Sequence, residues 1–267
     1  EDGIEDKDVT GVQTGALPTS RAMALTGVRV ASVAVLEGYG VLTGIPGQDQ
    51  RARALDVFER MYSPAIGTGA TMDYLGRTGL DALKGADILK TAADSYTSTI
   101  EYAETGIAQS LRGMAQVIFK GLGTRVLYTS QGGYDTHANQ VSVQTPLLSD
   151  LSAGIGDFFA DLSEHDAADN VMMLVFTEFG RRVKDNGSGS DHGSGGGCYL
   201  IGQPVKGGTL GDYPSLKEED QLDGDLHFNV AFRSDYSTIV DKWLGLDARS
   251  EERRVGKECR PRGAPYP

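Results

Sequence analysis

Residues 125–137 read RVLYTSQGGYDTH and decide how the chain is expected to fold. Residues 125–129 are mostly branched or apolar and are bounded by glycines, a pattern that predicts a short buried strand. The Gly-Gly pair that follows predicts a tight turn, since glycine adopts backbone angles that other residues avoid. Asp135 and His137 come directly after the turn, so the expected strand delivers a carboxylate and an imidazole at its end.

A helix and a second strand are expected next along the chain. Large apolar side chains recur on one side of residues 145–162, which predicts a helix. Residues 171–176 form an almost continuous apolar run, as in a parallel strand covered on both faces. Strand, helix and strand in this order predict a right-handed crossover unit. The expected fold class is therefore α/β, with a mostly parallel central sheet flanked by helices.

The remaining elements are expected from the same periodicities. Apolar steps of three and four residues predict helices, and short branched runs predict strands. The helices expected are 48–62, about 72–102 with interruptions near Gly76, Gly79 and Gly85, 107 to either Gly121 or Gly123, and 236–244. The strands expected are 28–36 and 198–201. Residues 185–197 are rich in glycine and serine and are expected to form an irregular loop.

Carboxylates and histidines cluster where the expected strands end. In open parallel sheets, ligands bind beyond the carboxyl ends of the strands, and Asp135, His137 and Glu178 fall there. Asp191 and His192 lie in the glycine-rich loop, which needs a reason to be ordered, and a bound ion supplies one. Carboxylate and imidazole groups that converge on one point indicate a metal site.

The strand-end candidates have plainer alternatives. Asp135 and His137 can be an Asx-turn beside a surface histidine, as short motifs of this kind usually are. Glu178 can form a salt bridge with Arg181 or Arg182 instead of binding a cation.

The other two histidines are weaker candidates for a site, and the context of His227 is ambiguous. His165 lies in a polar stretch after a helix and is expected to be a solvated loop residue, and His227 is expected to lie on the surface. A serine hydrolase is disfavoured, because none of the serines near His192 lies in a nucleophile elbow between strand and helix.

Composition argues against several classes of partner. A net charge of -12 and a sequence pI of about 4.8 disfavour a nucleic-acid partner, because binding a phosphate backbone needs a basic surface. No apolar run is long enough to span a membrane. Cys198 and Cys259 lie far apart in the sequence, so no disulfide framework is expected.

The two ends of the chain lack the apolar periodicity of the middle. Residues 1–20 and 249–267 resemble translated sequencing-adapter read-through at the ends of environmental gene fragments, and ordinary disordered termini are the alternative. The expected organisation is one α/β domain at residues 21–248, with non-native or disordered ends excluded from the fold.

Several motifs along residues 22–246 together resemble one family. They include SLR at 110–112, GYDTHANQ at 133–140, FTEFGRR at 176–182, DHG at 191–193, VKGG at 205–208, GDL at 224–226, and matching residues at 121–125 and 232–245. The chain resembles the bacterial family called domain of unknown function 1501, a branch of the alkaline phosphatase and sulfatase superfamily. This resemblance implies an alkaline phosphatase-like sheet, with a metal centre at the strand ends that binds a phosphate or sulfate ester.

The resemblance also implies roles for particular residues. By motif position, Asp135, His137 and His192 correspond to metal ligands, and Glu178 stands where a second-metal carboxylate is expected. Phe179 departs from the pattern, because many relatives have a histidine there. Full-length relatives carry an earlier aspartate ligand and a hydroxyl nucleophile, and no match for either is found here. The chain is therefore expected to be the C-terminal portion of a longer fold, truncated at its N-terminus.

The function expected is a metal-dependent hydrolase of small phosphate or sulfate esters. Asp191 is a further ligand or orients the others, and Arg181 is the catalytic candidate that contacts the anionic oxygens of the ester. Mixed carboxylate and imidazole ligation favours zinc or manganese over magnesium, and calcium occurs among sulfatase-like relatives. Relatives are usually exported, which implies a periplasmic or extracellular setting. The alternative is a non-catalytic metal-binding or surface module that has the fold but no nucleophile.

Overall fold

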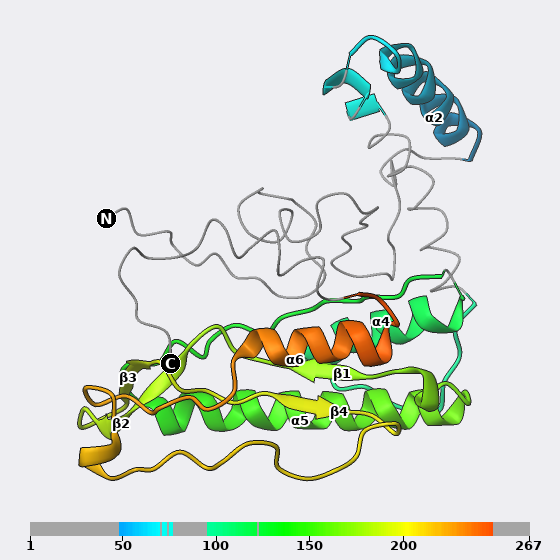
Figure 1. Ribbon diagram of the computed structural model, residues 1–267. Helices are drawn as coiled ribbons and strands as arrows, with labels where there is room; N and C mark the ends of the chain where they lie inside the picture. Colours follow the sequence, from blue (N-terminus) through cyan, green and yellow to red (C-terminus); the bar gives the residue numbers. More distant parts are fainter. Residues whose placement is uncertain (1–47, 70, 74, 77–94, 122, 248–267) are drawn as a thin grey trace. The chain divides into compact units, whose positions relative to one another are not determined.

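The computed structural model describes residues 48–247 apart from 70, 74, 77–94 and 122 (Figure 1). The chain divides into two compact units, and each is described by itself. The first unit runs to Met173 and includes Gly202–Pro204, and the second contains Leu174–Ile201 and the chain from Val205 onward. The strand expected at 28–36 and the two ends expected to be non-native lie outside the described residues.

The helix expected at 48–62 is confirmed as α2 (Gln48–Tyr62), which continues into the 3-10 helix η1 (Ser63–Ala65). Phe58 and Tyr62 lie four residues apart on one side of α2, and their ring centroids stack at 4.3 Å. The helix expected at about 72–102 is described only at its two ends. Residues 71–73 and 75–76 are helical, but residues 96–102 are not, so the expectation is wrong for that last segment.

The core of the first unit lies between α4 (Gly106–Phe119) and α5 (Gln140–Glu164), which confirm two of the expected helices. Thr105 caps α4 by accepting a hydrogen bond from the backbone N–H of Ala108. A Cβ at Gly154 of α5 would lie 3.4 Å from Ala108 Cα, so the two helices lie close to each other at these positions. The buried core residues are Tyr102, Ile107, Ala108, Leu111, Met114, Ala115, Phe158, Leu162 and Ala168.

A fully buried carboxylate, that of Asp161, joins α5 to the segment that precedes α4. Tyr96 and Tyr102 both donate their hydroxyl hydrogen to Asp161 Oδ2, at 2.6 and 2.8 Å. Burial, and then the hydrogen bond to Asp161, raise the pKa of Tyr96 to about 12 and also raise the pKa of Tyr102. Both hydroxyls therefore remain donors at neutral pH, which a buried carboxylate requires.

His165 ends α5, and the expectation of a solvated loop residue is wrong. Its Nδ1 lies 2.9 Å from the carbonyl oxygen of Asp161 and 3.2 Å from Oδ1 of the same residue, and its Nε2 lies 2.9 Å from the carbonyl oxygen of Thr97. A carbonyl oxygen only accepts, so both ring nitrogens must carry hydrogen, as in the imidazolium form. The hydrogen bond to the Asp161 backbone is the main cause that raises the pKa of His165. The imidazole also stacks on Phe119, with 4.1 Å between ring centroids.

The second unit, together with Met173, the first residue of β1, contains two small pairs of strands and a closing helix. In one pair β1 (Met173–Val175) lies beside β4 (Tyr199–Ile201), and in the other β2 (Gly180–Asp185) is antiparallel to β3 (Ser190–Gly193). β1 and β4 confirm strands expected at 171–176 and 198–201, although both are shorter. The closing helix is confirmed as α6 (Phe232–Thr238), which begins before residue 236 and continues into the single-turn π-helix η4 (Ile239–Trp243). The short 3-10 helices η2 (Ala168–Asn170) and η3 (Glu218–Asp220) belong to the first and second unit respectively.

The irregular loop expected at 185–197 is wrong for residues 185–193, because β2 and β3 form a hairpin there. Asn186 Oδ1 accepts hydrogen bonds from the backbone N–H groups of Ser188 (3.2 Å) and Gly189 (2.9 Å). Asp185 Oδ1 accepts a third, from the N–H of Gly187, whose φ of 103° suits glycine. The short polar side chains thus satisfy the turn backbone and bring the two strands together.

Residues 125–129, expected to form a buried strand, have no strand pairing in the structure, and Val126 is 62% exposed. An extended segment becomes a strand only when a neighbour accepts and donates its backbone hydrogen bonds, and the described part of the chain supplies no such neighbour here. The mostly parallel central sheet stays a prediction. None of the described helices is long and apolar enough to cross a membrane.

Replacing His165 with glutamine tests the buried network. Because folding raises the pKa of His165 above its unfolded value near 6.5, protonation stabilises the fold below that pH, and the contribution is lost as the pH rises through the folded pKa. We expect His165→Gln to lower the free energy of unfolding by about 1–3 kcal/mol at low pH, as for hydrogen bonds to a charged group, and by less at high pH. Urea denaturation at pH 5.5 and pH 9 measures the difference.

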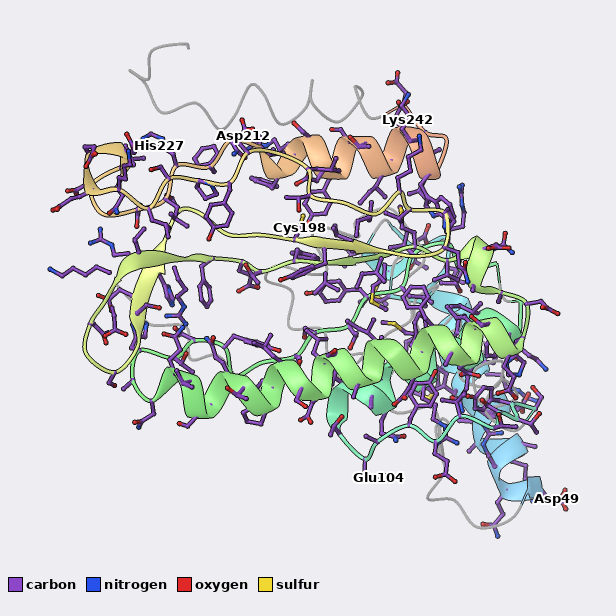
Figure 2. All side chains as sticks on the ribbon, turned by 90° about the horizontal axis from the view of Figure 1, so that it is seen from below. Asp49, Glu104, Cys198, Asp212, His227 and Lys242 are labelled. Atoms are coloured by element: carbon purple, nitrogen blue, oxygen red, sulfur yellow. The ribbon has the colours of Figure 1, made fainter. Side chains whose placement is uncertain are left out.

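His227→Gln is the matched control, because His227 is exposed on a loop of the second unit (Figure 2). It should leave stability unchanged at both pH values. A His165→Gln variant that loses equal stability at both would show that the imidazole is neutral in the folded protein.

Candidate metal centre

Residues 131–137, which carry the first two candidate ligands, are tied to α5 by the side chain of Gln131. Its Nε2 donates to the carbonyl oxygen of Leu147 (3.2 Å), and its Oε1 accepts from the hydroxyl of Tyr134 (2.9 Å). Gly133 has a φ of 93°, and a Cβ at that position would lie 3.0 Å from Leu147 Cδ1. The turn therefore needs glycine for its backbone angle, and it packs closely against the side chain of Leu147 in α5.

A second side chain of α5 holds the backbone on either side of Asp135. The amide nitrogen Nε2 of Gln144 donates to the carbonyl oxygen of Tyr134 (3.1 Å) and to Oγ1 of Thr136 (2.9 Å). The backbone N–H of Thr136 also donates to the carbonyl oxygen of Tyr134 at 2.9 Å, which closes a tight turn around Asp135. Thr136 is buried, so the turn faces the protein while Asp135 is exposed.

Asp135 and His137 lie next to each other, as their spacing predicts. Oδ1 of Asp135 lies 3.1 Å from Nε2 of His137, and both side chains are about half exposed. Two ligands of one ion, with bonds near 2 Å, lie about 3.3 Å apart in tetrahedral geometry and about 2.9 Å apart at right angles. The observed separation suits two ligands of one ion, and it equally suits an ion pair with a protonated histidine.

His192 lies in β3, directly opposite Arg181 of β2. Directly opposite residues of an antiparallel pair point to the same face, so the imidazole and the guanidinium share one side of the hairpin. The ring of Phe179 stacks on His192, with 4.0 Å between centroids and an interplanar angle of 14°. The guanidinium carbon of Arg181 lies 5.1 Å from the same phenyl ring. Phe179 therefore packs against a candidate ligand.

At three glycines of this region the chain approaches neighbouring segments very closely, an arrangement here called the close crossing. A Cβ at Gly180 would lie 1.9 Å from the carbonyl oxygen of Gly195, and a Cβ at Gly193 would lie 2.6 Å from the carbonyl carbon of Arg181. A Cβ at Gly195 would lie 2.4 Å from Cβ of Leu226. Contacts this short leave no room for any side chain, so the position of the strand that carries His192 depends on these residues being glycine.

Asp191 and Glu178 are both exposed in the second unit. Asp191 accepts a hydrogen bond from Asn186 Nδ2 at 3.3 Å. It precedes His192 in a strand, where successive side chains point to opposite faces, which makes it the weakest candidate for sharing an ion with that histidine. Glu178 lies between β1 and β2.

For Glu178 the alternative role is a salt bridge with Arg181 or Arg182. The ion pair that Arg182 makes is with Asp225. Nε of Arg182 lies 3.4 Å from Oδ1 of Asp225, a partly buried carboxylate. Asp225 itself belongs to a tight turn with Leu222, in which Leu222 donates to Asp225 at 2.9 Å and accepts from it at 3.0 Å. This ion pair therefore anchors β2 to the turn at residues 222–225.

Among the candidates, the structure brings together one pair in each unit. Asp135 and His137 lie in contact in the first unit, and Arg181 and His192 lie opposite each other in the hairpin of the second. That the two pairs contribute to one metal site stays a prediction.

Sequence reasoning missed the residues that hold these pairs. Gln131 and Gln144 bond to the loop across 16, 10 and 8 residues of sequence, and no periodicity points to such contacts. The stacking of Phe179 on His192 was equally invisible, because it depends on the hairpin that the sequence did not predict.

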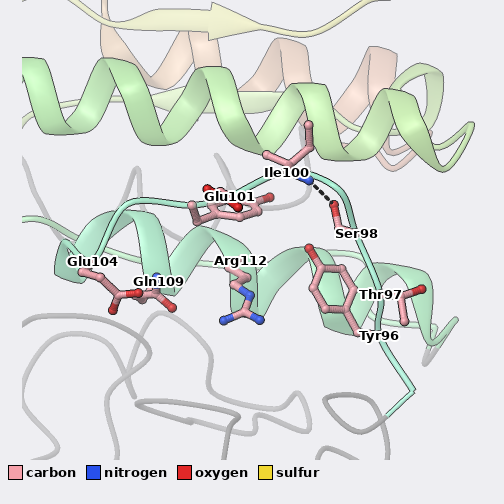
Figure 3. Close-up of a pocket in the computed structure, with 9 residues that line it drawn as sticks. Tyr96, Thr97, Ser98, Ile100, Glu101, Glu104, Gln109 and Arg112 are labelled. Atoms are coloured by element: carbon pink, nitrogen blue, oxygen red, sulfur yellow. Dashed lines mark hydrogen bonds between the residues drawn. The ribbon is translucent and has the colours of Figure 1, made fainter.

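A cavity of about 530 Å³ lies elsewhere in the first unit, beside the segment that precedes α4 (Figure 3). The guanidinium carbon of Arg112 lies 5.8 Å from the ring centroid of Tyr96, and the backbone N–H of Ile100 donates to Ser98 Oγ at 3.1 Å within its wall. The residues that line the cavity are Tyr96, Thr97, Ser98, Ile100, Glu101, Tyr102, Glu104, Gln109 and Arg112. None of them is a candidate metal ligand.

Replacing Gly180 with alanine tests whether the close crossing positions the hairpin. The new methyl group would overlap the backbone of Gly195, so we expect a loss of about 2–3 kcal/mol, as for overpacking of a tight contact. Thermal unfolding measures the loss, and hydrogen exchange of the β2 and β3 amides locates it. Gly197→Ala is the control, because a Cβ there would meet nothing within 4 Å. Equal stability of the two variants would contradict the close crossing.

Comparisons with known proteins bear on the whole region that holds the candidates. The model of the family described as "Protein of unknown function (DUF1501)" matches residues 76–254, which is more than half of the chain. A search of curated proteins and a search of solved structures each found no match. The matched range begins later than the resemblance seen in the sequence, which starts near residue 22, and it includes every candidate metal ligand.

Proposed function

The chain belongs to the DUF1501 family of proteins of unknown function, and from the geometry within each unit we propose that it binds a divalent metal ion for the hydrolysis of phosphate or sulfate esters. Asp135, His137 and His192 are the proposed ligands. The observation that carries the proposal is the 3.1 Å separation of Asp135 Oδ1 and His137 Nε2 on a loop held at several points. The proposal requires the ligand atom of His192 to come within about 5 Å of both, given metal bonds near 2 Å.

The donor set of the proposed site favours zinc or manganese. Imidazole nitrogen suits zinc and manganese better than magnesium or calcium, which prefer oxygen. Glu178 and Asp191 are proposed as outer carboxylates that orient the ligands or add to the negative charge of the site. Calcium remains an outcome of the metal test, because carboxylates are available.

Arg181 is the proposed contact for the substrate. Its guanidinium lies on the same face of the hairpin as His192, and a guanidinium binds phosphate or sulfate oxygens through parallel hydrogen bonds. A metal ion bound beside it would supply Lewis-acid stabilisation of the charge that develops on the ester oxygens. Arg181 also donates to the carbonyl of Ser190, which fixes its direction.

The proposed substrate is a small phosphate or sulfate ester, and the proposed location of the exported protein is periplasmic or extracellular. Both features rest on the family resemblance. The attacking group is not assigned. The alternative function is therefore a metal-binding or surface module with the same fold and no turnover.

Metal content separates this proposal from a simple ion pair. After dialysis against metal-free buffer and loading with Zn²⁺, we expect the chain to retain about one ion, as a three-ligand site does. His137→Gln and His192→Gln should each weaken Zn²⁺ binding by more than the roughly 10- to 100-fold typical of outer-shell changes. Calorimetric titration measures the affinities, and His227→Gln is the control. Binding that is the same in all three variants as in the parent chain would sink the proposed site.

Activity then separates the hydrolase from the non-catalytic module. We expect the Zn²⁺- or Mn²⁺-loaded protein to release nitrophenol from p-nitrophenyl phosphate or p-nitrophenyl sulfate, and Arg181→Met to raise KM for that ester, because it removes an anion contact. Metal that survives washing, with no turnover of either ester, would favour the module.

A further inference from the structure

Gln144 holds the two neighbours of Asp135 at once. Its Nε2 lies 3.1 Å from the carbonyl oxygen of Tyr134 and 2.9 Å from Oγ1 of Thr136. One amide group therefore bridges the residue before Asp135 and the residue after it. Building on the proposed metal site, we propose that Gln144 is a positioning residue that fixes the carboxylate of Asp135 beside His137 for metal binding.

The two hydrogen bonds from Gln144, here called the clamp, act on a loop whose backbone is not paired in a helix or strand. Residues 123–136 have no helix or strand hydrogen bonds, so side-chain bonds set the path of the backbone. Thr136 is buried and its N–H donates to the carbonyl oxygen of Tyr134, which makes Asp135 the apex of a tight turn. Gln144 donates to both ends of that turn and so closes it from the side of α5.

A second glutamine prevents the same loop from sliding along the helix. Gln131 donates to the carbonyl oxygen of Leu147 and accepts from the hydroxyl of Tyr134. Leu147 lies three residues after Gln144, one turn further along α5. The loop is thus fixed at two successive turns of one helix, which restricts both its distance from α5 and its register along it.

The helix that carries Gln144 and Leu147 is anchored at its other end, which lies in the core. Phe158 and Leu162 are almost completely buried against α4. A ligand carried by a loop is precise only when the supporting shell has little freedom, and changes in such outer contacts typically alter metal affinity by roughly 10- to 100-fold. Asp135 gains this support through Gln144, although Gln144 does not itself touch the ion.

A purely structural role for Gln144 makes a different prediction. If the amide only stabilises the loop, its loss lowers the stability of the metal-free protein and leaves the geometry of bound metal unchanged. If it positions Asp135, its loss changes the metal site itself. Co²⁺ distinguishes the two roles, because its visible absorption reports the number and arrangement of its ligands.

The test variant is Gln144→Met, which keeps the length of the side chain and removes the donor. We expect Co²⁺ affinity to fall about tenfold, with a changed intensity of the visible Co²⁺ band. Thr136→Val, which removes one of the two acceptors, should give a smaller fall. The double variant should be no weaker than Gln144→Met alone, since both changes break the same contact. Ser149→Ala, at an exposed position of α5, is the control.

The outcomes separate this proposal from the one on which it rests. Absence of Co²⁺ binding by the parent chain would overturn both. Binding by the parent chain with an unchanged affinity and band in Gln144→Met would overturn the positioning role alone. Additive losses in the double variant, with an unchanged band and a lower Tm of the metal-free protein, would show a structural role and also overturn it. Thr136→Val keeps the test decisive if Gln144→Met does not fold.

Discussion

The packing of α5 against α4 is the constraint on which the first unit depends. One end of α5 is held in the core, where Gly154 lies close to Ala108 of α4 and Asp161 accepts hydrogen bonds from the hydroxyl groups of two tyrosines. The other end carries the loop of Asp135 and His137 through side-chain amides. The core contacts and the contacts to the loop of the candidate ligands are therefore carried by one helix. In the second unit, the strand of His192 is held instead by close contacts at glycine residues.

The parts of the fold that the sequence predicted are those with local causes. α2, α4 and α5 follow from apolar side chains that repeat within each helix, and β1 and β4 follow from short apolar runs. The hairpin was missed because it depends on Asn186, whose side chain replaces backbone partners that composition alone does not reveal. His165 was misjudged for a similar reason, because Thr97, one of its partners, lies 68 residues away in sequence.

The candidate site also combines features with local causes, which the sequence predicts, and features set by distant contacts, which it does not. The closeness of Asp135 and His137 was predictable, because a spacing of two residues beside a glycine turn leaves little freedom. The sharing of one face by Arg181 and His192 was not, because it is set by the register of the hairpin. Gln144 gave no signal at all in the sequence. Its position on α5 beside the loop gives it a role, so the residue types that can bind metal are visible in the sequence and the residue that holds them is not.

Zinc-edge X-ray absorption of the Zn²⁺-loaded protein tests the central claim most directly, because it counts the imidazoles bound to the ion. The account predicts two imidazole nitrogens and at least one carboxylate oxygen at about 2.0–2.2 Å, with one imidazole lost in His192→Gln. A spectrum with a single imidazole that does not change in this variant would contradict it, because His192 would then take no part in the site of Asp135 and His137.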